Sequence, residues 1–139
     1  MNAEIFKERT KKIALECGKF VDDLQLKPSI RIYGNQLIRS SSSVCANYRA
    51  ACRAKSTADM INKLKIVEEE GDETIYWLEL IEESLSLNSN KLIWLKKETN
   101  EIVSMVVSSI NTLRKKQPPK CTNRKSKIVP ILNRMNRQL

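Results

Sequence analysis

Residues 39–83 read RSSSSVCANYRAACRAKSTADMINKLKIVEEEGDETIYWLELIEE, and this stretch decides how the chain folds. Ser56 or Thr57 is predicted to cap a helix, because Asp59 then falls in its first turn, where a carboxylate complements the helix dipole. Residues 40–43 are four serines of low helix propensity, but small side chains let a neighbouring backbone approach closely and hydroxyls can bond to the preceding turn. We interpret them as a close-contact surface between helices, and a phosphorylated or ligand-binding loop is the alternative.

Outward from this stretch, apolar residues recur at steps of three and four residues, which is the period of an amphipathic helix. The pattern predicts four helices, over about 3–26, 28–53, 57–85 and from after residue 90 to 116. Pro28 suits the first turn of a helix and disfavours helix at the residue before it. Only three glycines and four prolines occur among 139 residues, so the predicted class is all-α. We expect an antiparallel up-down-up-down four-helix bundle over residues 1–116 and a basic, largely flexible tail over residues 117–139.

The third helix is expected to pack its glycine against the serines of the second. A glycine in mid-helix is costly unless it allows close packing. The predicted inward stripe is Met60, Leu64, Val67, Gly71, Thr74 or Ile75, Leu78, Ile81 and Leu85.

The second helix carries arginines and no acid, whereas the third carries many carboxylates. Arg39 and Asn47 are expected to bond with Glu69 or Glu73, within one subunit or between subunits, and two separately solvated faces are the alternative. The predicted structural and interface residues are Arg39, Ser40, Ser43, Asn47, Glu69, Gly71 and Glu73.

The formal net charge of +9 is concentrated at the C-terminal end. Residues 1–113 hold 16 basic and 16 acidic side chains, whereas residues 114–139 hold nine basic and no acidic side chains. Such a segment favours a polyanion, because each phosphate that it neutralises releases counterions, although a solubilising terminus is an alternative. No base-reading motif is present, so binding to RNA or DNA is expected to be largely independent of sequence. The predicted nucleic-acid-binding residues are Arg49, Arg53, Lys55, Arg114, Lys115, Lys116, Lys120, Arg124, Lys125, Lys127, Arg134 and Arg137.

The composition argues against catalysis and against a cofactor or metal. Histidine is absent, which removes the commonest general base and the commonest zinc ligand together. Cys45 and Cys52 stand two helical turns apart, about 10 Å by helix rise, which is too far for a disulfide or a shared metal. With no apolar run long enough to cross a membrane and no signal-peptide pattern at the start, a cytoplasmic protein is expected.

Residues 128–139 combine apolar side chains with the basic character of the tail. This segment is predicted to form a short helix that docks on the bundle or on a partner. Membrane attachment is less favoured, because the segment has no bulky aromatic anchor. The apolar residues are Ile128, Val129, Ile131, Leu132, Met135 and Leu139.

The chain resembles a family of four-helix-bundle proteins encoded in intervening sequences of 23S ribosomal RNA genes, also labelled S23 ribosomal proteins. The resemblance spans roughly residues 5–113 and leaves the tail outside. It rests on Gln36, Arg39-Ser40, Ser43-Val44, Ala46-Asn47, Ser56 and the segment from Glu73 that ends in Leu80-Ile81-Glu82-Glu83-Ser84. The family includes the accessory variability determinant proteins of diversity-generating retroelements. The resemblance to these implies a homopentameric barrel that binds nucleic acid and associates with a reverse transcriptase during mutagenic copying of a template RNA.

One departure from the family pattern makes the second helix more basic. Many intervening-sequence members have Glu-Gly at the positions of Ala50-Ala51 and glycine at the position of Arg53. This change favours nucleic-acid binding over a direct link to ribosomal RNA.

Two functions are therefore carried forward. The first is a non-enzymatic nucleic-acid-binding accessory protein, a partner of a retroelement reverse transcriptase. The alternative is a structural oligomer of the family that binds proteins and has no direct nucleic-acid role.

Overall fold

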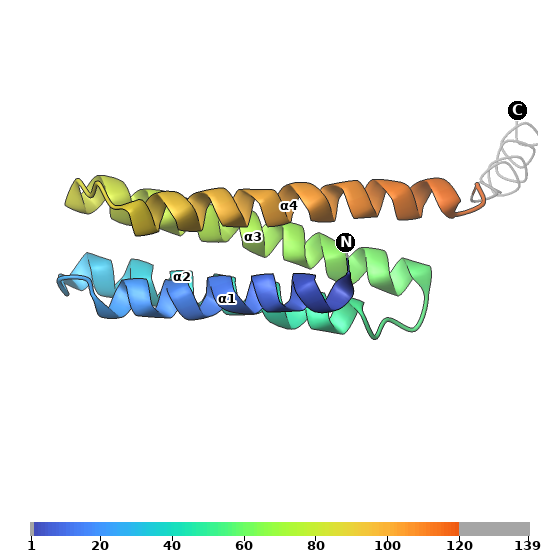
Figure 1. Ribbon diagram of the computed structural model, residues 1–139, viewed down its shortest axis with the longest axis horizontal. Helices are drawn as coiled ribbons and strands as arrows, with labels where there is room; N and C mark the ends of the chain where they lie inside the picture. The colour runs from blue at the N-terminus through green and yellow to red at the C-terminus, as the bar shows by residue number, and fades with distance from the viewer. Residues whose placement is uncertain (1, 120–139) are drawn as a thin grey trace, which may run out of the picture.

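The computed structural model of the protein describes residues 2–119, which form four helices and no strand. The helices are α1 (Ala3–Asp22), α2 (Pro28–Ala51), α3 (Thr57–Leu85) and α4 (Asn90–Lys116) (Figure 1). The all-α class and the four helices are thus as the sequence predicts. The predictions for residues 120–139 of the tail, including the short helix at 128–139, concern residues outside the described range.

Local chemistry explains most of the helix ends. Ser56 caps α3 by accepting a hydrogen bond from the backbone N–H of Asp59 at 3.1 Å, which decides between the two predicted caps. Pro28 occupies the first turn of α2, as expected. The helix α3 ends at Ser86, which adopts a left-handed backbone conformation with φ of 48°. The first helix stops at Asp22, four residues before the predicted end, because residues 24–27 leave the helical conformation ahead of the proline.

Each helix packs against its neighbours in the chain, and α1 also contacts α4. The contacting residues pair in opposite order along α1 and α2, along α2 and α3, and along α1 and α4. Phe6 meets Tyr48 while Val21 meets Gly34, and Tyr33 meets Trp77 while Arg39 meets Glu73. Between α1 and α4, Arg9 pairs with Glu98 and Glu16 pairs with Lys91.

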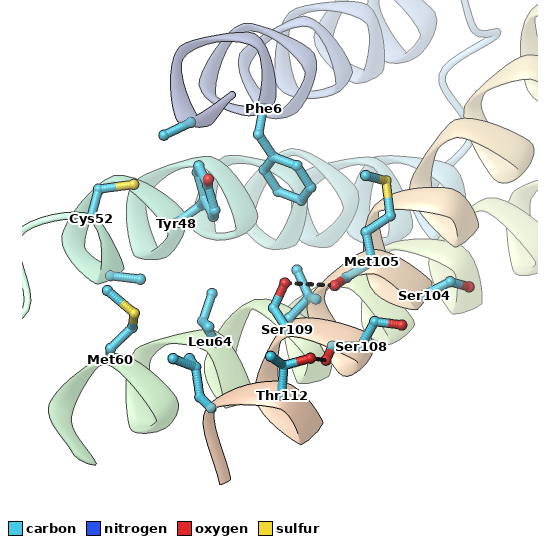
Figure 2. Close-up of a pocket in the computed structure, with 14 residues that line it drawn as sticks. Phe6, Tyr48, Cys52, Met60, Leu64, Ser104, Met105, Ser108, Ser109 and Thr112 are labelled. Carbon is cyan, nitrogen blue, oxygen red and sulfur yellow. Dashed lines mark hydrogen bonds between the residues drawn. The ribbon is translucent and has the colours of Figure 1, made fainter. Parts of the chain in front are cut away.

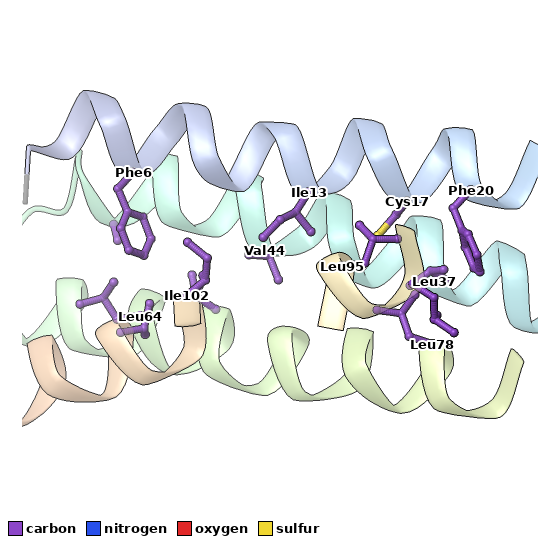
Figure 3. Packing of buried hydrophobic residues seen from close by; sticks show 14 of the residues in the cluster. Phe6, Ile13, Cys17, Phe20, Leu37, Val44, Leu64, Leu78, Leu95 and Ile102 are labelled. Carbon is purple, nitrogen blue, oxygen red and sulfur yellow. The ribbon is translucent and has the colours of Figure 1, made fainter. Parts of the chain in front are cut away.

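The core runs the length of the helices and consists mainly of aliphatic side chains (Figure 3). The buried positions of α3 match the predicted stripe from Leu64 to Ile81, with Thr74 rather than Ile75 turned inward. At the start of the stripe, Ile61 is buried in place of the predicted Met60. Met60 and Leu85, at the two ends of that stripe, are half-buried. The fully buried large side chains include Ile13, Ile30, Leu37, Val44, Val67, Leu78, Ile81, Leu92, Leu95, Ile102 and Val106.

The serines of α2 form a close-contact surface, as the sequence predicts. Ser40 and Ser41 are fully buried, whereas Ser42 is exposed and Ser43 is half-buried. The Ser40 hydroxyl donates to the carbonyl of Leu37 at 3.3 Å and accepts from the hydroxyl of Thr74 on α3 at 3.0 Å. Hydroxyls bonded in this way are satisfied without water, so α2 and α3 can approach closely.

Replacing a buried serine with a larger apolar residue is expected to destabilise the bundle. Ser40→Val adds volume where α2 meets α3 and should lower the free energy of unfolding by about 1–3 kcal/mol. Ser42→Val is the matched control, because this exposed position should change stability by less than about 0.5 kcal/mol. Urea unfolding of both variants measures the difference, and equal stabilities would contradict the close-contact interpretation.

Two glycines mark other close approaches, and one of them does not face the predicted neighbour. A Cβ atom at Gly34 would lie 2.8 Å from a methyl carbon of Val21 on α1. A Cβ atom at Gly71 would lie 2.4 Å from a methyl carbon of Val103 on α4. The prediction that Gly71 faces the serines of α2 is therefore wrong. Thr74, one turn along, occupies that place.

Candidate nucleic-acid interface

Basic side chains from separate parts of the chain lie at one end of the bundle. Figure 1 shows the start of α1, the end of α2, the start of α3 and the end of α4 at the same end of the long axis. The end of α2 and the loop after it carry Arg49, Arg53 and Lys55, and the last turn of α4 carries Arg114, Lys115 and Lys116. All six are exposed. We call these six residues the basic end.

In the described part of the chain, the cations of the basic end are not held in ion pairs, although Arg49 contributes, after Lys7, to lowering the pKa of the nearby Glu4 carboxyl. No side chain of the six forms an ion pair with another residue in the range 2–119. Arg49 and Arg114–Lys116 lie in the last turns of their helices, where cations also complement the helix dipoles. That role is compatible with ligand binding, because the exposed charges stay accessible to a phosphate. The other six predicted nucleic-acid-binding residues, Lys120, Arg124, Lys125, Lys127, Arg134 and Arg137, lie outside the described residues.

Arg39 links α2 to two carboxylates of α3. Its guanidinium bonds with Glu73, as expected, and with Glu70 at 3.2 Å. Glu69, the other expected partner, is exposed, so Glu70 replaces it. The indole N–H of Trp77 also donates to Glu73 at 3.0 Å. Arg39 and then Trp77 lower the pKa of the Glu73 carboxyl, so this group keeps its negative charge.

Asn47 does not reach the carboxylates of α3, which corrects the second half of that prediction. Its side-chain amide donates to the backbone carbonyl of Ser43 at 2.9 Å and to the Ser43 hydroxyl at 3.0 Å. A short polar side chain in a helix is readily satisfied by the preceding turn. Ser43 and Asn47 therefore stabilise α2 locally.

A cluster of ion pairs between α1 and α4 escaped the sequence analysis. Arg9 donates to Glu98 at 2.7 Å and to Glu101 at 2.8 Å, and its guanidinium also contacts the sulfur of Met105 at 3.5 Å. Glu98 is the main cause of the raised pKa of the Arg9 guanidinium. Lys12 lies 5.2 Å from the ring centroid of Trp94. The charged residues of both helices are visible in the sequence. Which of them form ion pairs depends on α1 and α4 lying side by side, and the sequence pattern does not show that.

An apolar groove opens beside the basic end and was also missed. It encloses about 790 Å³ and is lined by residues of all four helices. Figure 2 shows the rings of Phe6 and Tyr48 on one side and Leu64 on the other. Hydroxyl-bearing residues of α4 follow the rim, and two of them, Ser109 and Thr112, donate to carbonyls of their own helix at 2.9 and 3.0 Å.

The cysteines differ in exposure rather than forming a site. Cys17 is fully buried, and burial raises the pKa of its thiol to about 12. Cys45 is half-buried, whereas Cys52 is exposed and lines the groove. In residues 2–119, no group of three or more histidine, cysteine, aspartate or glutamate side chains is placed to hold a metal ion.

Comparison with known proteins identifies the family. The family model of the 23S rRNA-intervening sequence protein matches residues 4–108. The chain belongs to this family. The crystal structure of a protein of unknown function from the S23 ribosomal protein family of Bacteroides thetaiotaomicron is similar, with a TM-score of 0.72 and 30% sequence identity. The similarity covers 80% of this chain and 99% of that protein, and no curated protein is significantly similar.

The family match divides the basic end. It includes Arg49, Arg53 and Lys55 but stops at residue 108, before the last turn of α4. The three cations of that last turn therefore lie outside the matched region. Within the described part of the chain, no helix is sufficiently long and apolar to span a membrane.

Proposed function

We propose that this 23S rRNA-intervening sequence protein is a non-enzymatic, cytoplasmic protein that binds RNA or DNA through its basic end and its basic tail. The observation that supports the proposal is the gathering of six cations that form no ion pair within residues 2–119. They come from α2, the loop after it and α4, at the end where the chain continues into residues 120–139. Phosphate groups spaced along a nucleic-acid backbone match such a cluster without any reading of base sequence.

The proposal extends to architecture and assembly. The four helices form an antiparallel up-down-up-down bundle, which the opposite order of the residue pairs supports. Such bundles assemble into a homo-oligomer, a pentamer by resemblance to the accessory variability determinant proteins. In that setting the chain serves as the accessory partner of a retroelement reverse transcriptase, holding template RNA by its backbone. Each subunit would then contribute one basic end, and several ends on one assembly raise the avidity for a long polyanion.

Light scattering tests the binding and the assembly together. The mass of the full-length protein is measured alone and with a structured RNA, at low and at high salt. We expect a stable oligomer at both salts and an RNA complex that dissociates at the higher salt. Replacing Arg49, Arg53 and Lys55 with alanine should weaken RNA binding while leaving the oligomer intact. A monomer would contradict the assembly, and binding that ignores salt would contradict the electrostatic mechanism.

A structural, protein-binding oligomer is the second candidate. It is favoured by the large apolar side chains that the described residues leave exposed. In this case the assembly recovers protein partners after nuclease treatment and shows no RNA complex at either salt. The exposed side chains are Ile5, Leu15, Leu26, Ile32, Ile38, Ile66, Tyr76 and Ile93.

A further inference from the structure

We propose that the apolar groove beside the basic end is the docking site of residues 128–139 of the same chain. The inference does not depend on nucleic-acid binding. It rests on the shape of the groove, on the surface of α4 that borders it, and on the pattern and position of the segment.

The groove exists because α4 is longer than α1. Helix α1 has 20 residues and α4 has 27. Arg9 lies level with Glu98, and Glu16 with Lys91, so the start of α1 falls near residue 104 of α4. The remaining twelve residues of α4, about 18 Å by helix rise, extend past the start of α1 (Figure 1). Packing on this side of the bundle is therefore incomplete over the last three turns of α4.

The surface of α4 along this overhang is uncharged as far as Leu113, before the last turn with its three cations. Residues 102–113 read IVSMVVSSINTL, with no charged residue, although charged residues make up 29% of the chain. Ser104, Ser108, Ser109 and Thr112 are nevertheless exposed. A solvated helix face normally carries charges, whereas small residues with locally bonded hydroxyls permit another helix to pack closely.

The interior of the groove is apolar. Phe6 and Leu64 are each 5% exposed and Val106 is 1% exposed, so these side chains supply a firm floor. Tyr48, Met105 and Leu113 are half-buried at its sides. A volume of about 790 Å³ accepts several aliphatic side chains together.

The apolar residues of the C-terminal segment have the spacing that such a groove accepts. Pro130 suits the first turn of a helix and disfavours helix at the residue before it, so a helix here begins near Pro130. Within it, Leu132, Met135 and Leu139 stand at i, i+3 and i+7, and Ile131 stands four residues before Met135, which is the anchor pattern of an amphipathic helix in a groove. On a helical projection Arg137 falls opposite this apolar face, and Arg134 falls at its flank. A helix over residues 130–139 would be about 15 Å long, which fits within the overhang of α4.

The connection favours the same chain over a second copy. Leu113, which lines the groove, lies only three residues before the end of α4. Eleven residues, 117–127, then separate the helix from Ile128 and can span at most about 40 Å. This is ample for a return along about 18 Å of helix, so the segment meets its own groove at a high effective concentration.

Docking has a consequence for the charge of the surface. With the apolar side chains in the groove, Arg137 faces outward and Arg134 lies at the flank, both beside the basic end. The docked segment would thus complete the packing at this end of the bundle. It would also enlarge the positively charged surface formed by the basic end.

Hydrogen exchange of the full-length protein without nucleic acid tests the docking. The matched variant replaces Ile131 and Leu132 with aspartate, outside the four-helix region, so the bundle itself stays folded. We expect amides of residues 105–116 to exchange at least about tenfold faster in this variant, because the uncovered helix end frays. Arg134→Asp with Arg137→Asp is the control and should leave exchange unchanged. Equal exchange in the wild type and the Ile131/Leu132 variant would overturn the proposal.

Disulfide trapping distinguishes the same chain from a second copy. Cys45 and Cys121 are replaced with serine, which leaves exposed Cys52 in the groove and the unreactive, buried Cys17. A cysteine is then introduced singly at Ile131, Leu132, Met135, Arg134 or Arg137. We expect at least one apolar position to cross-link within a single chain about tenfold faster than either arginine position. Cross-links that join two chains would assign the groove to a second copy and overturn the proposal as stated.

Discussion

Truncation after Gln117 is expected to halve the salt dependence of RNA binding. The full-length chain offers up to twelve predicted cations to a nucleic acid, six of them in residues 118–139. Each neutralised phosphate of a single strand contributes about 0.7 to the slope of log affinity against log salt, so the slope should fall from about 8 to about 4. Fluorescence anisotropy with a labelled single-stranded RNA, between 50 and 200 mM salt as a suggested range, measures both slopes.

A charge-neutral variant separates the electrostatic effect from the loss of the segment. Replacing the same six cations with glutamine keeps every apolar residue of the tail and should lower the slope as much as truncation does. The six are Lys120, Arg124, Lys125, Lys127, Arg134 and Arg137.

The two variants together decide what the tail does. If truncation lowers the slope and glutamine replacement does not, the tail acts through its apolar residues and the electrostatic mechanism is wrong. If neither changes the slope, the tail does not contact the RNA. A further variant replaces Arg49, Arg53 and Lys55 with alanine. It should lower the slope by about 2 in both the truncated and the glutamine-substituted protein, because independent phosphate contacts are lost additively.

The sequence predicted which residues are buried better than it predicted what they touch. A period of three and four residues identifies the inward face of a helix, and Leu64, Val67, Leu78 and Ile81 are buried as expected. The same period does not say which of two neighbouring helices a residue meets. Gly71 is buried as predicted, but it lies against Val103 of α4.

Side-chain partners depend on angles that a sequence pattern does not resolve. Glu70 and Glu73 lie three residues apart and share one face of α3, where Arg39 reaches both. Glu69 is turned away by a further 100° of helix rotation and stays exposed. Asn47 was expected to reach across to α3, but its short side chain finds partners in its own helix.

The basic end could be predicted in part from the sequence, whereas the groove could not. The charges of Arg49, Arg53 and Lys55 are visible in the sequence, and the fold places the end of α2 at the same end of the bundle as the end of α4 (Figure 1). The groove depends on the offset between the start of α1 and the end of α4. That offset is set by contacts between the two helices, such as the ion pair of Arg9 with Glu98. The periodicity of apolar residues along one helix does not predict such contacts.

Substitution of Gly71 by alanine is expected to change sign with the identity of residue 103. In the natural chain the new Cβ atom would lie 2.4 Å from a methyl carbon of Val103, well inside van der Waals contact. Val103 is β-branched and 9% exposed, so its methyl groups cannot turn away freely. The resulting overpacking costs about 1–3 kcal/mol. Alanine regains about 1 kcal/mol of helix propensity, so we expect a net loss of up to about 2 kcal/mol of stability.

In a Val103→Ala background the same substitution should stabilise the protein. The obstructing methyl groups are gone, and the propensity gain of about 1 kcal/mol remains. The coupling between the two sites is therefore expected to be about 1–3 kcal/mol, measured by urea unfolding of the two single variants, the double variant and the natural chain. Gly18 provides a matched control on α1, because a Cβ atom there would meet nothing within 4 Å. Gly18→Ala should stabilise the protein in both backgrounds, and additive effects of Gly71→Ala and Val103→Ala would show that close approach to α4 is not why glycine is needed at position 71.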